Sequence, residues 1–188
     1  RQISVERETL LLPRPFIVIA TQNPVELEGT FPLPEAQLDR FLMRLRMDYP
    51  SQSEERLILQ RFREEQPLQE LKPVVSAEQL QDLQRAIRHV RVEPSVEIYI
   101  VEIVRATRTH SRVELGVSPR GTLALYRTTQ AYAAIHGRSY VIPDDVKRTA
   151  PHVLPHRMIA TSQARLHGRL LEQIVDDVLH TVPVPVEL

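Results

Sequence analysis

The pattern of apolar and polar residues changes character along the chain. Near the N-terminus, apolar positions in residues 3–5 and 9–12 suit the two strands of a hairpin, and residues 16–20 (FIVIA) form an unbroken apolar run. Such a run is typical of a strand that is covered on both faces, as in a parallel sheet. The pattern therefore predicts part of an α/β sheet within residues 1–48.

From about residue 51 onward the pattern predicts helices, because apolar residues recur at helical spacing behind helix-start signals. Ser51 with Glu54 and Ser76 with Gln79 have the spacing of capping boxes, which satisfy free amides in a first helical turn. The expected helices begin at Ser51, Ser76, Pro94, Ser118 (this one ending at Gly137) and Pro143, and a closing amphipathic helix covers residues 170–178. An all-helical part therefore follows the sheet.

Three hydrogen-bonding side chains come directly after the apolar run: Thr21, Gln22 and Asn23. In open α/β sheets, ligands bind beyond the carboxyl ends of the strands, which is where these residues are expected to lie. A simple loop cap would need the same residue types. The residues alone therefore leave a ligand site and a loop cap both open.

Composition narrows the class of protein. A chain of 188 residues that is 42% hydrophobic can bury a core, and its 24 basic residues balance its 24 acidic ones. The balance argues against a nucleic-acid partner, and the lack of cysteine excludes disulfides and thiolate chemistry. No stretch approaches the roughly 20 apolar residues of a membrane span, and the N-terminus is too polar for a secretory signal. We expect a cytoplasmic protein without membrane insertion.

Three motifs together resemble the C-terminal half of a MoxR-type AAA+ ATPase, in their order and spacing. They are ATQNP at 20–24, EGTFPLPEAQLDRF at 28–41, and GVSPRGTLALYRTTQAYAAIHGRSYVIPDDVK at 116–147. The resemblance implies an α/β remnant plus an all-α part. Residues 1–48 would be the C-terminal part of the AAA+ core, with strands at 16–21 and 42–47, and residues 49–188 would be the helical lid domain.

The resemblance also assigns roles to three residues. Asn23 falls on the sensor 1 position, which holds the attacking water or the γ-phosphate, and Arg40 falls on the arginine finger, which reaches the ATP site of a neighbouring subunit. From the residues alone, Arg40 would more readily pair with a carboxylate, and Asp39 is interpreted as a helix-end charge.

Arg120 falls on the sensor 2 position of the family, and here the residues carry a signal of their own. It is expected at the second position of the helix after Ser118, where the helix dipole disfavours a cation by about 0.3–1 kcal/mol. An anion should compensate, and a phosphate would fit well. Contact with Glu114 or with water remains the alternative.

The phosphate-cradling and metal-binding motifs of an ATPase are missing from the 188 residues. Gly116 and Gly121 have the outer spacing of a P-loop, but Thr122 follows where lysine should stand. We therefore expect a fragment that lacks the Walker A and Walker B regions. ATP and Mg²⁺ are expected as cofactors of the full-length protein, and neither should bind this chain tightly by itself.

The missing segment also affects the sheet. In AAA+ proteins, a strand from the absent region lies between the two strands expected at residues 16–21 and 42–47. Residues 1–48 should therefore not form a free-standing half-sheet, since both strands would keep unpaired backbone groups.

Two functions remain open. The first is an ATPase that remodels or matures partner protein complexes, acting as a homo-oligomeric ring, expected to be a hexamer, with a von Willebrand factor A domain protein as a further partner. The second is a non-enzymatic helical interaction module. No metal site is expected, because Pro155 interrupts the turn between His152 and His156 and no third ligand is evident.

Overall fold

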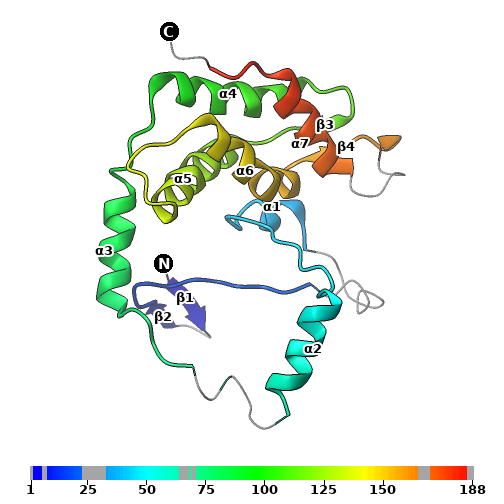
Figure 1. Cartoon of the computed structure of the whole chain (residues 1–188). Helices are drawn as coiled ribbons and strands as arrows, with labels where there is room; N and C mark the ends of the chain where they lie inside the picture. Colours follow the sequence, from blue (N-terminus) through cyan, green and yellow to red (C-terminus); the bar gives the residue numbers. More distant parts are fainter. Residues whose placement is uncertain are drawn as a thin grey trace. The chain divides into compact units, whose positions relative to one another are not determined.

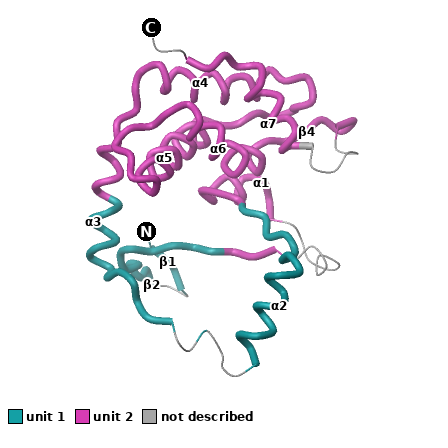
Figure 2. Tube along the Cα trace, in the orientation of Figure 1, with its two compact units in different colours: residues 1–19, 45–84 teal, residues 20–44, 85–188 magenta. Residues whose placement is uncertain are grey.

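The computed structural model describes residues 2–5, 8–22, 33–63, 68, 71–164 and 170–185. The chain divides into two compact units, one of residues 1–19 and 45–84 and the other of residues 20–44 and 85–188 (Figure 2). We refer to them as unit 1 and unit 2 and describe each by itself. The division between core and lid expected at residues 48 and 49 stays a prediction.

Unit 1 contains the predicted hairpin and the predicted capping boxes. Strands β1 (Gln2–Val5) and β2 (Glu8–Leu11) pair in antiparallel register, with Gln2 opposite Leu11. Helix α2 (Gln52–Arg61) begins with the expected reciprocal hydrogen bonds between Ser51 and Glu54. The same exchange between Ser76 and Gln79 starts α3 (Ala77–Ile87). Local sequence signals therefore predicted these helix starts correctly.

The strands expected over residues 16–21 and 42–47 are not formed. In the described ranges the only sheets are two-stranded, β1 with β2 and β3 (Val113–Leu115) with β4 (Ile159–Ala160). Ile19 is 80% exposed and Met47 is 97% exposed, although Met43 packs against the core of unit 2. A strand suited to burial on both faces needs neighbouring strands for its backbone groups and its side chains, and no described strand pairs with either segment. The absence of a free-standing half-sheet matches the expectation.

Unit 2 is a helical assembly built around one hydrophobic core (Figure 1). Its elements are α1 (Glu35–Leu38), α4 (Pro94–Thr109), α5 (Pro119–Ile135), α6 (Pro143–Val153), the short 3-10 helix η3 (Pro155–Arg157), α7 (Leu170–Thr181) and the pair β3-β4. The largest fully buried apolar side chains come from α4, α5, α6 and α7 and from the residue before η3, and include Tyr99, Ile103, Leu125, Val146, Leu154 and Ile174. The fold class, a remnant of an AAA+ α/β core with a helical lid, is confirmed.

The connection between α5 and α6 is held by a partly buried ion pair. Gly137 ends α5 as expected, with φ of 73°, a backbone conformation that glycine adopts at low cost. The next residue, Arg138, donates two hydrogen bonds of 2.6 and 2.5 Å to Asp145, whose side chain is 2% exposed. Asp145 also accepts a bond of 2.9 Å from the Ile142 amide. Its carboxylate therefore joins the loop to the first turn of α6.

Within the described residues, no helix is both long and apolar enough to cross a membrane.

Candidate functional site

Two of the three predicted site residues lie in the described part of unit 2. Arg40 follows α1 and is exposed, and Arg120 is the second residue of α5. Asn23 lies outside the described residues. The structure brings the residue next to Arg40, Asp39, into contact with Arg120.

Helix α5 begins with the expected N-cap residue and first-turn proline. Ser118 occupies the N-cap position with extended backbone and Pro119 is the first helical residue. The Ser118 hydroxyl makes no capping bond to its own helix and donates a long hydrogen bond of 3.5 Å to Asp39 Oδ2 instead. Arg120 Nη1 lies 3.7 Å from the same oxygen. The anion that faces Arg120 is therefore the Asp39 carboxylate.

The contact between Arg120 and Asp39 is loose. The Arg120 side chain is 58% exposed, and exposed pairs at such distances typically contribute about 0–1 kcal/mol. Arg120 can therefore leave Asp39 at little cost when a stronger anion is offered. The positive end of α5 would favour the same anion.

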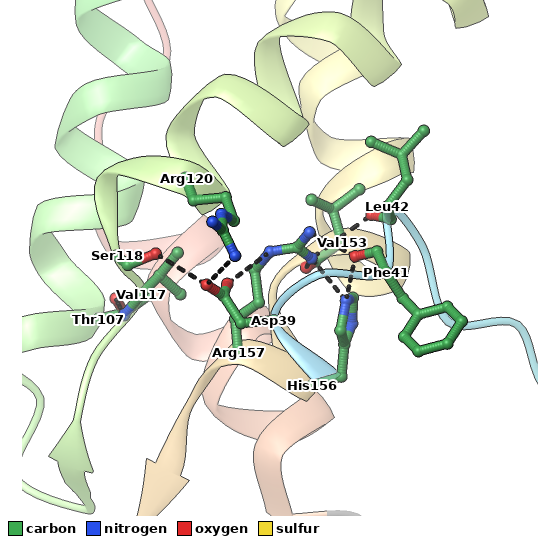
Figure 3. Close-up of polar contacts among 10 residues, drawn as sticks. All are labelled: Asp39, Phe41, Leu42, Thr107, Val117, Ser118, Arg120, Val153, His156 and Arg157. Atoms are coloured by element: carbon green, nitrogen blue, oxygen red, sulfur yellow. Dashed lines mark hydrogen bonds and ion pairs between the residues drawn. The ribbon is translucent and has the colours of Figure 1, made fainter. Parts of the chain in front are cut away.

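A second arginine, which the sequence pattern did not predict, approaches Asp39 from the other side (Figure 3). Arg157 lies in η3 with its side chain 2% exposed, and its Nε is 3.3 Å from Asp39 Oδ1. It donates to the carbonyl oxygens of Phe41 at 2.5 Å, Leu42 at 3.4 Å and Val153 at 2.7 Å. Arg157 therefore attaches the segment after α1 to the end of α6.

Gly121 leaves the space that Arg157 occupies. A Cβ atom at this position would lie 2.2 Å from Val117 Cγ1 and 3.0 Å from Arg157 Cδ. A glycine inside a helix normally costs up to about 1 kcal/mol relative to alanine, so its presence in the first turn of α5 indicates a close approach. This glycine is the one sequence signal that could have pointed to a neighbour at this position.

The burial of Arg157 has an electrostatic cost that Asp39 offsets. Burial lowers the pKa of the Arg157 guanidinium, the Asp39 carboxylate raises it again, and the nearby Arg120 lowers it. Asp39 Oδ1 and Arg157 Nε are both buried without a hydrogen bond to any described residue, so their contact is an ion pair without good hydrogen-bond alignment. One carboxylate thus faces two guanidiniums, and the cluster can accept a further negative charge.

His156 completes the cluster. Its Nε2 lies 2.5 Å from Arg157 Nη1 and 3.2 Å from the Phe41 carbonyl oxygen, and its Nδ1 is buried without a partner among the described residues. Burial lowers the pKa of His156, and the positive charge of Arg157 lowers it further. The ring therefore stays uncharged, and a bare Nε2 can accept a hydrogen bond from Arg157.

Protonation of His156 should destabilise unit 2. The pKa of His156 is below the ordinary value of about 6.5 in the folded chain, so the unfolded chain binds the proton first as the pH falls. Stability is then complete above about pH 6.5 and decreases below it, by at most about 1.4 kcal/mol per pH unit, until the folded-state pKa is reached. Urea unfolding at pH 7.5 and 5.5 should show this loss in the wild type and a smaller loss in His156→Gln. The exposed His136→Gln serves as control, and an equal pH dependence in both variants would contradict the prediction.

Two protein-family models match the chain. The first is the AAA lid domain, which matches residues 105–178, and the second is the ATPase family associated with various cellular activities (AAA), which matches residues 1–43. The candidate cluster draws residues from both matched regions, with Asp39 in the second and Arg120 and Arg157 in the first.

Similar proteins match nearly the whole chain. An uncharacterized Bacillus subtilis protein, YeaC, is 51% identical over 98% of this chain and 58% of its own length. Chaperone MoxR1 of Mycobacterium tuberculosis is 39% identical over 98% of this chain and 51% of its own length. A crystal structure of a candidate ATPase from Cytophaga hutchinsonii superposes with a TM-score of 0.91 at 34% identity, covering 98% of this chain and 59% of that one. The chain thus spans between half and three-fifths of the length of these relatives.

Proposed function

Since this chain belongs to the MoxR-type AAA+ ATPases, we propose that it supplies the sensing and lid part of an ATP site in a chaperone-like ATPase. The 188 residues contain no P-loop motif, so the phosphate-cradling segment would come from sequence outside them. ATP binding and hydrolysis would then drive the remodelling or maturation of partner protein complexes.

The observation that carries this proposal is the position of Arg120. It lies at the positive end of a 17-residue helix, it is exposed, and its counter-ion Asp39 holds it only at 3.7 Å. A γ-phosphate can replace that carboxylate, because it carries more charge and accepts several charge-assisted hydrogen bonds at once. Arg120 would then act as sensor 2, linking the lid to the state of the nucleotide.

The described side chains offer groups that suit a phosphate. Nowhere in the described ranges do three His, Asp or Glu side chains gather so that they could hold a metal ion. Mg²⁺ would neutralise phosphate charge in the complete site, and we assign no residue of this chain to it. The side chains of this chain would bind and orient the phosphates and stabilise charge in the transition state.

The other two site residues would complete this role. Asn23 would act as sensor 1 and position the attacking water, and Arg40 would act as the arginine finger of a neighbouring subunit. Arg40 suits such a role because it is exposed and its side chain makes no ion pair or hydrogen bond with any residue that the structure describes. A finger in trans requires a homo-oligomeric ring, for which we propose a hexamer with a von Willebrand factor A domain protein as partner.

The test uses Arg120→Gln in the full-length protein with its P-loop. Affinity for ATP should fall about tenfold or more, because hydrogen bonds to charged groups contribute roughly 1.5–3 kcal/mol. Titration with a fluorescent ATP analogue measures the affinity, and phosphate release measures turnover. Arg127→Gln is the matched control, since Arg127 lies on the same helix and is exposed, with a hydrogen bond to Gln130 and a cation–π contact with the Tyr126 ring.

The alternative, a non-enzymatic helical interaction module, makes the opposite prediction. A ligand that binds only the native state must raise its melting temperature. If saturating ATP and Mg²⁺ leave the melting temperature of the full-length wild type unchanged, the module is favoured and Arg120 merely pairs with Asp39. If ATP raises the melting temperature of the wild type but Arg120→Gln has wild-type affinity and turnover, the ATPase proposal stands without a sensor 2 role for Arg120.

A further inference from the structure

The groups on both sides of Arg40 are held by one side chain. Asp39 precedes Arg40 and contributes its carboxylate, and Phe41 and Leu42 follow it and contribute their carbonyl oxygens. All three groups contact the guanidinium of Arg157 (Figure 3). Arg157 therefore contacts the residues on both sides of Arg40 in the sequence, and none of its contacts is with the Arg40 side chain.

The segment around Arg40 has little regular structure of its own. Helix α1 has only four residues and ends at Leu38, directly before Asp39. After it, the backbone amide of Arg44 donates a bond of 2.8 Å to the His152 carbonyl at the end of α6. The backbone on either side of Arg40 is therefore held by contacts to the α6–η3 region, among which Arg157 supplies the most, together with the amide bonds of Arg40 to Gln37 and of Phe41 to Leu38.

We propose that Arg157 is a positioning residue that orients Arg40 toward the ATP site of the neighbouring subunit. The inference rests on the proposed function, because it needs Arg40 to act as an arginine finger. An error of about 1 Å in the position of a catalytic group can cost on the order of 100-fold in rate. The 2% exposure of Arg157 and its three carbonyl acceptors provide the required rigidity.

The geometry also separates the roles of the two arginines that share Asp39. Arg120 is exposed and loosely paired, so it can move to a phosphate, whereas Arg157 is enclosed and has acceptors on several sides. When Arg120 leaves, Asp39 keeps Arg157 as its counter-ion. Arg40 would therefore stay in position through the nucleotide cycle.

Arg157→Lys is the informative variant. Lysine keeps the positive charge against Asp39 but is a point charge, whereas the planar guanidinium presents five donors in a fixed fork. In the full-length protein we expect kcat for ATP to fall about 100-fold while KM stays within about threefold. The core variant Ile174→Val, which lowers stability without removing any polar contact of Arg157, should leave kcat nearly unchanged.

Two further measurements distinguish positioning from a general loss of structure. In an Arg40→Ala background, Arg157→Lys should change kcat by less than about threefold, because its effect passes through Arg40. Mixing Arg157→Lys subunits with P-loop-defective subunits that keep both arginines should restore activity, since a correctly placed finger is then supplied in trans. If Arg157→Lys fails to fold, Asp39→Asn weakens the same contact with an isosteric side chain and should give a loss of kcat that recovers on mixing. Because Asp39 also faces Arg120, this loss is compared with that of Arg120→Gln.

The outcomes separate this inference from the proposed function. Wild-type kcat in the Arg157→Lys variant, an equal loss in the Arg40→Ala background, or no recovery on mixing would overturn the positioning role while leaving the ATPase intact. If the wild-type protein does not hydrolyse ATP, or if Arg40→Ala has no effect, the proposed function or its finger fails and the inference fails with it.

Discussion

Replacing Arg40 with alanine in the full-length, P-loop-containing protein should lower ATP turnover by about 10³-fold or more and leave nucleotide affinity nearly intact. A finger from the next subunit meets the nucleotide mainly when charge develops on the transferred phosphate, so its removal affects kcat rather than ground-state binding. Arg40 is exposed and no described residue pairs with its side chain, so the substitution leaves no buried partner behind. Steady-state phosphate release and titration with a fluorescent ATP analogue measure the two quantities.

A mixing experiment tests whether Arg40 acts between subunits. Subunits with Arg40→Ala retain an intact P-loop, and P-loop-defective subunits retain Arg40, so mixed rings should contain some complete sites. Turnover above that of either variant alone is expected. If no ratio of the two restores turnover, Arg40 does not act in trans. If Arg40→Ala matches the wild type, Arg40 is a surface residue without a role in hydrolysis.

Local features of the fold were predictable from the sequence because their causes lie within a few residues. At Ser51 and Ser76 the helix start follows from a side chain that accepts a hydrogen bond from an amide of the first turn. At Pro119 it follows from a residue that has no amide hydrogen to satisfy. The stop at Gly137 follows from the backbone freedom of glycine. None of these features needs a distant partner, and each was therefore correctly predicted.

The strands expected at residues 16–21 and 42–47 show the opposite case. Their apolar side chains favour extended, buried backbone, but a strand forms only where another strand offers hydrogen bonds. The described chain offers no such strand to either segment. The apolar pattern predicted the extended preference of residues 16–21, and the resemblance implied the strand at 42–47. The outcome depends on a partner strand, which the resemblance, and not the local pattern, indicated to be absent.

In the candidate site too, a locally determined feature was predictable and a feature that depends on distant residues was not. The position of Arg120 in a first helical turn, and its need for an anion, were predictable, although the anion in the structure is Asp39. Arg157 was missed because its contacts join residues more than 100 positions apart, as in its bond to Phe41 with a separation of 116. A buried arginine at the end of a helix looks like a surface arginine until its long-range partners are known.

A large loss of stability should follow from Arg138→Gln. Asp145 is 2% exposed and receives both hydrogen bonds from Arg138, so the substitution leaves a buried carboxylate without its counter-ion. Breaking a buried pair from one side typically costs about 3–5 kcal/mol, and the 24% exposure of the Arg138 side chain places this pair at the low end of that range or below it. Urea unfolding followed by circular dichroism should show this loss. Lys147→Gln is the matched control, because it breaks an exposed pair with Asp144 at 3.6 Å and should cost less than about 1 kcal/mol.

The double variant Arg138→Gln/Asp145→Asn identifies the cause of that loss. Asparagine keeps an oxygen that can accept the bond from the Ile142 amide but carries no charge. The double variant therefore removes the buried charge that Arg138→Gln leaves without a counter-ion. It should therefore be more stable than Arg138→Gln alone. If it is less stable, the carboxylate contributes beyond its pairing with Arg138. If Arg138→Gln costs no more than Lys147→Gln, the ion pair does not hold the loop between α5 and α6, and the cap at Gly137 together with the backbone bonds between this loop and Arg91 must suffice.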